Sequence, residues 1–405
     1  MNEASDVIVV GAGPCGSFTA LNLARLGRSV TVFEEHSQIG VPSHCPGHLS
    51  MKGLKQLGLH PLPPEIVENT FYGANFYSPK GNKFSVHFSQ PVTCAVDRAM
   101  FDKYIAEKAQ DAGAIYRLNT RVEALILKNA FAEGALVKHE ETTKNMQASV
   151  VVDAEGISSR ILNEAGLPRP QKFVKGVEAE VQNVKDAEPD AVDVYLGKNY
   201  APGFYGWLIP KKDGKAKVGL AARSGNPKEL LQKLMLKHPA ASKKLQSARI
   251  LKATFHPITL GGPTAQAYSN GFLAVGDAAS QVKPTTGGGV IFGMTCAQVA
   301  AEVASEALGK NDLSKEFLCN YQNRCREIFG FDMKIMLRMR KTLDALSDER
   351  VDDAIALCAK LRLDKILQNV KDIDFQGQTL LQVLRSPRML TALAYFFFAY
   401  LSANT

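Results

Sequence analysis

Three glycines near the N-terminus have the spacing that a dinucleotide-binding turn requires. Gly11, Gly13 and Gly16 form a GxGxxG motif directly after the apolar run from Asp6 to Val10. The first glycine permits a tight turn, the second lets the backbone approach a pyrophosphate, and the third allows a helix to pack closely on the strand. Pro14 suits the first helical turn, where its missing N–H costs nothing. The motif therefore predicts a site for a dinucleotide cofactor.

Glu34 is the candidate for binding the ribose of that cofactor. A helix is expected to end at Gly27, and the segment from Ser29 to Phe33 (SVTVF) is typical of a second buried strand, which ends in Glu34. A carboxylate in this place accepts hydrogen bonds from both ribose hydroxyls and disfavours a 2′-phosphate. The pocket is therefore predicted to take FAD or NAD rather than NADP.

Further strands and glycines downstream are predicted to complete this nucleotide site. The segment 150–156 (VVVDAEG) and the segment 271–277 (GFLAVGD) are apolar runs that end in acidic residues and glycine. Arg98 opens an expected helix that ends near Gly113, and strands are expected at 115–118 and 122–127. A glycine triplet at 287–289 precedes a long helix of small residues, expected over 290–308.

This ordered set resembles the glutathione-reductase-type FAD fold, in the branch that includes aromatic hydroxylases and geranylgeranyl reductases. The resemblance covers about three quarters of the chain. It implies an α/β fold (with α+β elements): a Rossmann-type FAD-binding domain, an antiparallel-sheet substrate domain and a helical C-terminal region. The implied FAD-binding domain is discontinuous (1–70, 90–170 and 260–310), the substrate domain comprises 71–89 and 171–259, and the helical region comprises 311–405.

The same resemblance assigns roles to particular residues. Asp277 would bind the ribityl chain, Arg98 would lie near the flavin, and the Gly287–Gly289 turn would face the pyrimidine edge of the isoalloxazine. A helix that begins after this turn would stabilise the anionic reduced ring through its free N–H groups and partial positive charge. Further FAD-binding residues implied by the resemblance are Cys15, Glu35, Cys45, Gly47, Val122, Gly276, Pro284, Gly288 and Val290.

One segment separates the reductases from the hydroxylases of this branch. Residues 202–210 (PGFYGWLIP) resemble the PxxYxWxFP motif of geranylgeranyl reductases, with Ile209 in place of the usual phenylalanine. On a strand, Tyr205, Trp207 and Ile209 would share one face. These side chains would make an apolar wall for a long polyprenyl chain, although the same pattern also suits the core of a sheet. The segment 283–289 is likewise more similar to the reductase version than to the hydroxylase version.

A cysteine and a histidine in the loop 42–50 (PSHCPGHLS) are further candidates for the site. Relatives in this branch often have a Cys-Gly pair here, whereas Pro46 separates Cys45 from Gly47 in this chain. Cys45 is a candidate proton donor and His48 a candidate substrate contact. The alternative is that Cys45 is a small buried apolar residue.

The resemblance implies the saturation of C=C bonds in geranylgeranyl chains of archaeal-type glycerophospholipids or their precursors. An isolated alkene has no electron-withdrawing group, so protonation must assist hydride addition from the N5 atom of reduced FAD. Cys45, Tyr205 or an ordered water are the candidate acids. Two alternatives stay open: a flavin-dependent monooxygenase of an aromatic or polyprenyl substrate, and a flavoprotein that binds lipid or carries electrons without catalysis.

Composition narrows the partners further. The seven cysteines are scattered without CxxC or Cys/His ligand spacing, so no metal site is predicted. The net charge of +8 is accompanied by no nucleic-acid motif. Because the sequence contains one GxGxxG motif, the expected electron donor is external, either a ferredoxin-like protein or transiently bound NAD(P)H.

The C-terminal region raises the question of membrane contact. No signal peptide is visible, so a cytoplasmic location is expected. The apolar run 389–405 is shorter than the roughly 20 residues needed to cross a bilayer. Together with nearby basic clusters, it is expected either to cap the lipid pocket or to lie on a membrane surface, and an ordinary packed terminal helix is the alternative.

Overall fold

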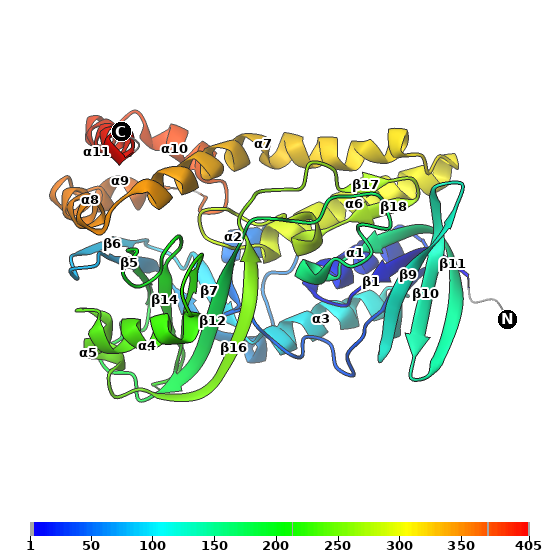
Figure 1. Ribbon diagram of the computed structural model, residues 1–405, viewed down its shortest axis with the longest axis horizontal. Helices are drawn as coiled ribbons and strands as arrows, with labels where there is room; N and C mark the ends of the chain where they lie inside the picture. The colour runs from blue at the N-terminus through cyan, green and yellow to red at the C-terminus, as the bar shows by residue number, and fades with distance from the viewer. Residues whose placement is uncertain (1–3, 213, 371, 404–405) are drawn as a thin grey trace. The chain divides into compact units, whose positions relative to one another are not determined.

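The computed structural model describes residues 4–212, 214–370 and 372–403. They form two compact units (Figure 1). The first unit comprises the chain up to Ser43, Arg98–Lys172 and Thr259–Phe331, and the second comprises His44–Asp97, Phe173–Ile258 and the chain from Asp332 onward. The expected fold class is confirmed. The expected division into functional domains stays a prediction.

The first unit contains a largely parallel sheet in the strand order β17-β18-β11-β1-β2-β8. The expected apolar runs form its central strands because side chains on both faces are buried, as in β1, where Val7–Val10 are at most 4% exposed. The antiparallel strands β9 and β10 join this sheet through β11. Its elements are β1 (Ser5–Val10), α1 (Pro14–Arg25), β2 (Val30–Phe33), α3 (Arg98–Asp111), β8 (Ile115–Arg117), β9 (Thr120–Lys128), β10 (Phe131–His139), β11 (Thr142–Asp153), β17 (Tyr268–Ser269), β18 (Phe272–Ala274) and α6 (Val290–Lys310).

Helix α1 begins and ends where the sequence signals predict. Gly13 is its N-cap and Pro14 its first residue, while Gly27, with φ of +77°, follows its end. Helices α3 and α6 pack on α1. Short 3₁₀ turns follow β11 (Gly156–Ser158) and β18 (Gly276–Ala279). These helices and turns place the glycine-rich segments next to one another.

The second unit contains a sheet in the order β16-β12-β15-β14-β13-β5-β6 and a smaller one in the order β3-β7-β4. In this sheet β15 is antiparallel to β12 and β14, β13 is antiparallel to β14, and β5 is antiparallel to β6, whereas β13 and β5 are parallel. The strands are β3 (His48–Ser50), β4 (Val67–Phe71), β5 (Gly73–Tyr77), β6 (Lys83–His87), β7 (Thr93–Val96), β12 (Phe173–Gln182), β13 (Ala191–Tyr195), β14 (Gly206–Pro210), β15 (Ala216–Ala222) and β16 (Arg249–Thr259).

Helices cover this unit and fill its C-terminal part. Helix α4 packs on β15 and β12, and its Leu231 and Leu234 share a core cluster with Leu208 of β14. The C-terminal helices pack on β6 through Phe84 and Val86. The helices are α2 (Met51–Gln56), α4 (Pro227–Lys237), α5 (Ala241–Leu245), α7 (Lys315–Ala345, which begins in the first unit), α8 (Asp348–Lys360), α9 (Asp364–Leu367), α10 (Gln376–Val383) and α11 (Pro387–Ala403), with a 3₁₀ turn at Pro64–Ile66.

Candidate functional site

The nucleotide candidates lie at one edge of the parallel sheet. Gly11 follows β1, Glu34 follows β2, Asp153 ends β11 and Gly276 follows β18 shortly after its end. These four strands are parallel, so their carboxyl ends meet at the same edge. Ligands of open α/β sheets bind outside this edge.

The GxGxxG turn leaves space at one glycine and none at the other two. Gly11 has φ of +97°, and a Cβ there would lie 2.6 Å from the oxygen of Ala154. A Cβ on Gly16 would lie 1.9 Å from the oxygen of Gly11, whereas one on Gly13 would meet nothing within 4 Å. Gly13 also caps α1 without any side-chain hydrogen bond to the helix N-terminus. The open space beside these N–H donors fits a pyrophosphate.

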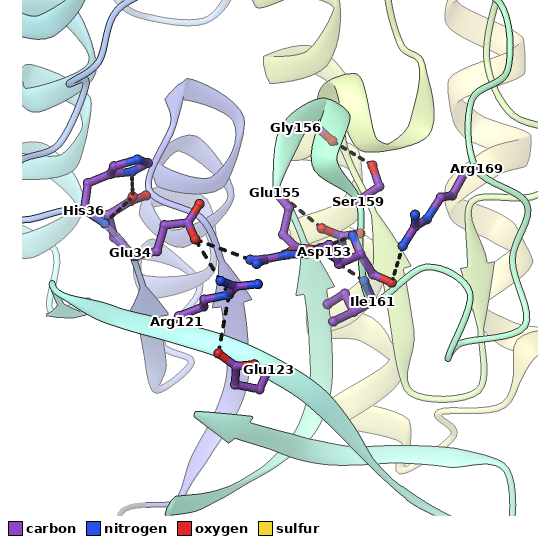
Figure 2. Close-up of polar contacts among 12 residues, drawn as sticks. Glu34, His36, Arg121, Glu123, Asp153, Glu155, Gly156, Ser159, Ile161 and Arg169 are labelled. Atoms are coloured by element: carbon purple, nitrogen blue, oxygen red, sulfur yellow. Dashed lines mark hydrogen bonds and ion pairs between the residues drawn. The ribbon is translucent and has the colours of Figure 1, made fainter. Parts of the chain in front are cut away.

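The Glu34 carboxylate is held at the turn by three hydrogen bonds. Its Oε2 accepts from the backbone N–H of Ala12 at 2.8 Å. Its Oε1 accepts from the backbone N–H of His36 at 3.0 Å and lies 2.6 Å from the His36 ring (Figure 2). The neighbouring Glu35 points elsewhere, 3.5 Å from an Arg160 guanidinium nitrogen and 3.9 Å from Arg121 Nε. The fold thus orients Glu34 and leaves Glu35 in a partly exposed ion-pair cluster.

Asp153 contributes a buried carboxyl to the same edge (Figure 2). One of its oxygens accepts from the N–H of Glu155 at 2.9 Å, and among the described residues the other has no partner. Burial and then the charge of Glu155 raise the pKa of Asp153 to about 8. Asp153 is therefore largely protonated at pH 7. Glu155 pairs with Arg160 at 3.0 Å.

Cys15, Arg98 and Asp277 come together from three helical segments. The Cys15 sulfur is packed so closely that a Cβ on Gly276 or Gly293 would lie 2.8 or 2.5 Å from it. Arg98 makes a two-pronged pair with Asp102, through Nε at 3.0 Å and a terminal nitrogen at 2.9 Å. Burial raises the pKa of Asp277, and the charge of Arg98 opposes that rise. Arg98 is therefore close enough to Asp277 to affect the pKa of its carboxyl electrostatically.

The glycine triplet lies beside Asp277. Gly287 has φ of +69° and donates its N–H to the oxygen of Lys283 at 2.8 Å. Gly289 caps α6, and a Cβ there would lie 3.0 Å from the Asp277 carboxylate. Pro284, Gly288 and Val290 belong to the same turn and helix start. Val122 lies on β9, buried opposite Val137.

In the second unit, Trp207 and Ile209 of the segment 202–210 lie on one side of β14. Trp207 and Ile209 alternate with Leu208, which faces the core under α4. The Trp207 ring lies against β15, since a Cβ on Gly219 would meet it at 2.5 Å. Tyr205 precedes the strand instead of lying within it, but it still accepts a backbone hydrogen bond from Ala221 at 3.2 Å. We call Tyr205, Trp207 and Ile209 the apolar wall.

The aromatic rings of the wall continue into Phe204 and a buried arginine. Tyr205 stacks on Phe204 at 4.3 Å between ring centroids and meets Trp207 edge-on at 6.0 Å. The Arg340 guanidinium lies 5.7 Å from the Phe204 ring centroid and pairs with Asp344 at 2.7 Å. Burial raises the pKa of Tyr205, the charge of Arg340 opposes the rise, and a charge on Cys45 adds to it. Cys45 is therefore close enough to Tyr205 to affect it electrostatically.

The loop that carries Cys45 is fixed just after the cysteine. Gly47 has φ of +70° and donates its N–H to the Cys45 sulfur at 3.5 Å, while its own oxygen accepts from Val96 at 3.0 Å. His48 pairs with Thr93 at 2.7 Å through its ring and contacts Phe71 edge-on at 5.6 Å. The His48 ring thus has structural partners within the small sheet.

Four residues of these clusters were not predicted from the sequence. Asp102 lies one helical turn after Arg98, so the i,i+4 pairing rule could have found it. Arg340 pairs with Asp344 at the same i,i+4 spacing. Gly293 packs on Cys15, and Lys217 of β15 donates to the backbone oxygens of Pro46 and Val96; neither has a local signal, because these partners are distant in sequence. In the part of the chain that the structure describes, no three His, Cys, Asp or Glu side chains gather as a metal ion would require.

Comparisons with known proteins agree with this geometry. The model of the FAD binding domain family matches residues 4–329. The chain is 33% identical over 393 residues to digeranylgeranylglycerophospholipid reductase 2 of Methanopyrus kandleri, covering 95% of this chain and 97% of that one. It is 32% identical to the protein of the same name from Methanothermobacter thermautotrophicus, covering 96% and 98%.

A solved structure extends the similarity to three dimensions. A geranylgeranyl bacteriochlorophyll reductase-like protein from Thermoplasma acidophilum superposes with a TM-score of 0.87 at 25% identity, covering 97% of this chain and 99% of that one. The chain therefore belongs to the digeranylgeranylglycerophospholipid reductase family and carries an FAD binding domain.

Proposed function

We propose that this protein is an FAD-dependent reductase that saturates C=C bonds in the geranylgeranyl chains of glycerophospholipids or their precursors. The observation that carries the proposal is similarity at 33% identity across 95% of the chain to a relative named for this substrate. This similarity spans both compact units. It therefore includes the apolar wall and the residues of the first unit that we call the nucleotide cluster, namely Gly11, Gly13, Gly16, Glu34 and Asp277. A fold match alone would not separate a reductase from other flavoproteins.

The nucleotide cluster is proposed to hold FAD in an extended form. Gly11, Gly13 and Gly16 would admit the pyrophosphate to the N-terminus of α1, and Glu34 would accept from the ribose hydroxyls. Asp277 would bind the ribityl chain beside the start of α6. When reduced, bound FAD supplies the hydride for alkene reduction. Arg98 is balanced by Asp102, so it would act as a fixed positive charge beside Asp277.

The apolar wall is proposed to hold a polyprenyl chain. Trp207 and Ile209 face away from the core cluster under α4, and Gly219 lets the Trp207 ring lie flat along the sheet. The side chains of the wall would contact an aliphatic chain by burial of apolar area. Holding the alkene in one orientation and excluding water are the contributions that this wall would make.

Cys45 is proposed as the proton donor. Of the two candidate side chains, Tyr205 is the weaker acid, because burial raises the pKa of its phenol. Loss of a proton from Tyr205 would leave a buried phenolate, which is unfavourable. The Cys45 sulfur accepts the N–H of Gly47, and this contact would stabilise the thiolate left after proton transfer.

The electron donor is proposed to be external to this chain. The sequence has one GxGxxG motif, which FAD would occupy, and the net charge of +8 would favour an acidic protein such as a ferredoxin. NAD(P)H bound transiently is the alternative donor. Comparing initial rates with each donor at rising ionic strength separates the two, since association with an acidic protein carrier slows steeply with salt.

The C-terminal region is proposed to contact a membrane surface from the cytoplasmic side. Among the described residues, no helix has the length and apolarity needed to span a bilayer. A shallow cavity of about 410 Å³ at α9, α10 and the start of α11 is lined by Lys365 and Arg385 together with the apolar Ile366 and Val383. Among the described residues, no carboxylate lines this cavity. A cavity lined by both cationic and apolar side chains is suited to an anionic phospholipid headgroup.

Two exposed aliphatic side chains lie close in sequence to residues that line this cavity. Leu381 of α10 is 54% exposed and lies four residues before Arg385, and Leu390 of α11 is 51% exposed and lies four residues after Ser386. These side chains could enter the interfacial region while the cations contact headgroups. The last two residues of the apolar run, 404 and 405, lie outside the described residues.

Neutralising the two cations is expected to weaken binding to anionic vesicles. With Lys365→Gln and Arg385→Gln combined, co-sedimentation with vesicles of mixed phosphatidylcholine and phosphatidylglycerol should fall about 10- to 30-fold, at about 1 kcal/mol per cation. The control is Lys128→Gln with Lys138→Gln, which makes the same charge change on exposed positions of β9 and β10. Equal loss in both variants, or no binding by the wild type, would refute the membrane proposal.

Product analysis tests the reductase proposal itself. Protein reduced with dithionite is incubated anaerobically with a digeranylgeranylglycerophospholipid, and the lipid is analysed by mass spectrometry. A gain of two hydrogens for each double bond supports reduction. Product that forms only in air and contains an added oxygen supports the monooxygenase, and binding without turnover supports a lipid-binding or electron-transfer flavoprotein.

A further inference from the structure

Lys217 is a buried cation on the wall face of the larger sheet. It lies on β15 directly opposite Ile209, and only 8% of its surface is exposed. A buried ammonium is unfavourable unless each of its three N–H groups finds a partner. Its Nζ donates to the backbone oxygens of Pro46 at 3.0 Å and Val96 at 3.2 Å, and it pairs with the Glu68 carboxylate at 2.5 Å. Lys217 thus has two backbone acceptors and one ion-pair partner.

Two of these partners determine the position of the Cys45 loop. Pro46, which provides one of the acceptor carbonyls, directly follows Cys45 in the chain. Val96, which provides the other, is the last residue of β7. The N–H of Val96 donates to the oxygen of Gly47, and the N–H of Gly47 donates to the Cys45 sulfur. Lys217 therefore ties together the loop, β7 and the strand beside the wall, at the point where the loop carries its sulfur.

We propose that Lys217 is a positioning residue that holds the Cys45 thiol at the apolar wall. This inference rests on the proposed role of Cys45 as proton donor. A proton donor must lie within hydrogen-bond reach of the atom it protonates, and displacement by about 1 Å lowers rates by about 100-fold. Lys217 lies opposite Ile209 of the wall and donates to the carbonyl of Pro46, the residue after Cys45, so this contact joins the loop to the wall.

The ion pairs around Lys217 provide a matched control. Glu68 is shared, because its other oxygen pairs with Lys211 at 2.9 Å, and Lys211 also pairs with Glu180 at 2.8 Å. Removing either lysine leaves Glu68 with one cation. Among the described residues, Lys217 donates to the Pro46 and Val96 carbonyls and Lys211 does not. The two lysines therefore separate loop positioning from charge balance.

The test compares Lys217→Met with Lys211→Met in FAD-loaded protein. Two quantities are measured: steady-state reduction of a digeranylgeranylglycerophospholipid, and alkylation of Cys45 by iodoacetamide, resolved by peptide mass spectrometry. For Lys217→Met we expect kcat to fall about 10- to 100-fold with KM within about threefold, and Cys45 alkylation to change about tenfold. For Lys211→Met both should stay within about twofold of wild type.

Unchanged Cys45 alkylation and kcat in folded Lys217→Met protein would overturn the inference, and so would equal effects of the two lysine variants. If Lys217→Met does not fold, Lys217→Arg and Lys217→Ala are compared instead. Because arginine keeps the charge and the donors, Cys45 alkylation in Lys217→Arg should be closer to wild type than in Lys217→Ala. The reverse order would overturn the inference. If the wild type reduces no lipid but Cys45 alkylation still differs between Lys217→Met and wild type, the positioning role of Lys217 is retained and the proposed reductase function is refuted.

Discussion

Replacing Gly13 by alanine is expected to remove most FAD from the protein while leaving the fold intact. A Cβ at this position meets no atom within 4 Å, so the protein itself has room for it. The same Cβ would enter the space beside the α1 N-terminus that the pyrophosphate is proposed to fill. Loss of one or two charge-assisted hydrogen bonds at about 1.5 kcal/mol each would weaken FAD binding by about 10- to 100-fold. Titration of the apoprotein with FAD measures this change.

Two other glycine variants are the controls for this prediction. Gly330→Ala lies inside α7, with the nearest atom 3.8 Å from the new Cβ, and is expected to bind FAD normally. Gly16→Ala places its Cβ 1.9 Å from the Gly11 oxygen and is expected to lower the thermal stability of the apoprotein as well. Normal FAD affinity in Gly13→Ala would contradict the proposed pyrophosphate site, and its unfolding would show that the turn has no spare room.

Replacing Cys45 by alanine is expected to lower the turnover number by about 100- to 10,000-fold, the contribution of a general acid. FAD content and lipid binding should change little, because the substitution leaves the backbone hydrogen bonds of the loop, at Pro46 and Gly47, in place. Rates of single-turnover lipid reduction by pre-reduced protein measure the chemical step without the external electron donor.

Tyr205→Phe separates the two candidate acids. Because burial raises the pKa of Tyr205, its phenol stays protonated through neutral and mildly alkaline pH. Ionisation of Tyr205 should therefore cause no change in the turnover number of the wild type in that pH range. Its loss is expected to lower turnover less than about tenfold, through the ring contacts alone. Undiminished turnover in Cys45→Ala together with a large loss in Tyr205→Phe would reverse the assignment.

Local features of the nucleotide unit were predictable because they depend on short-range sequence. The GxGxxG turn, Pro14 at the start of α1 and Gly27 after its end follow from backbone conformations that few other residues allow. The buried strands β1 and β2 were readable as apolar runs. The expected helix 290–308 differs from α6 by two residues at its end.

Long-range features were not predictable from local patterns. The position of β11 between β1 and β18, and the parallel pairing of β13 with β5, join segments far apart in the chain. Lys217 gives no signal in the sequence, because its partners Pro46, Val96 and Glu68 are more than a hundred residues away. Tyr205 lies just before β14 rather than within it, a one-residue difference at an element boundary.

The central claim is that this protein adds hydrogen to isolated double bonds of a lipid held against its cofactor. The most direct measurement follows flavin absorbance and lipid mass together, under argon, as pre-reduced protein is mixed with a digeranylgeranylglycerophospholipid in deuterated water. We predict one saturated bond, with two deuterium atoms and no added oxygen, for each flavin reoxidised. Flavin that stays reduced while the lipid mass is unchanged would contradict the claim.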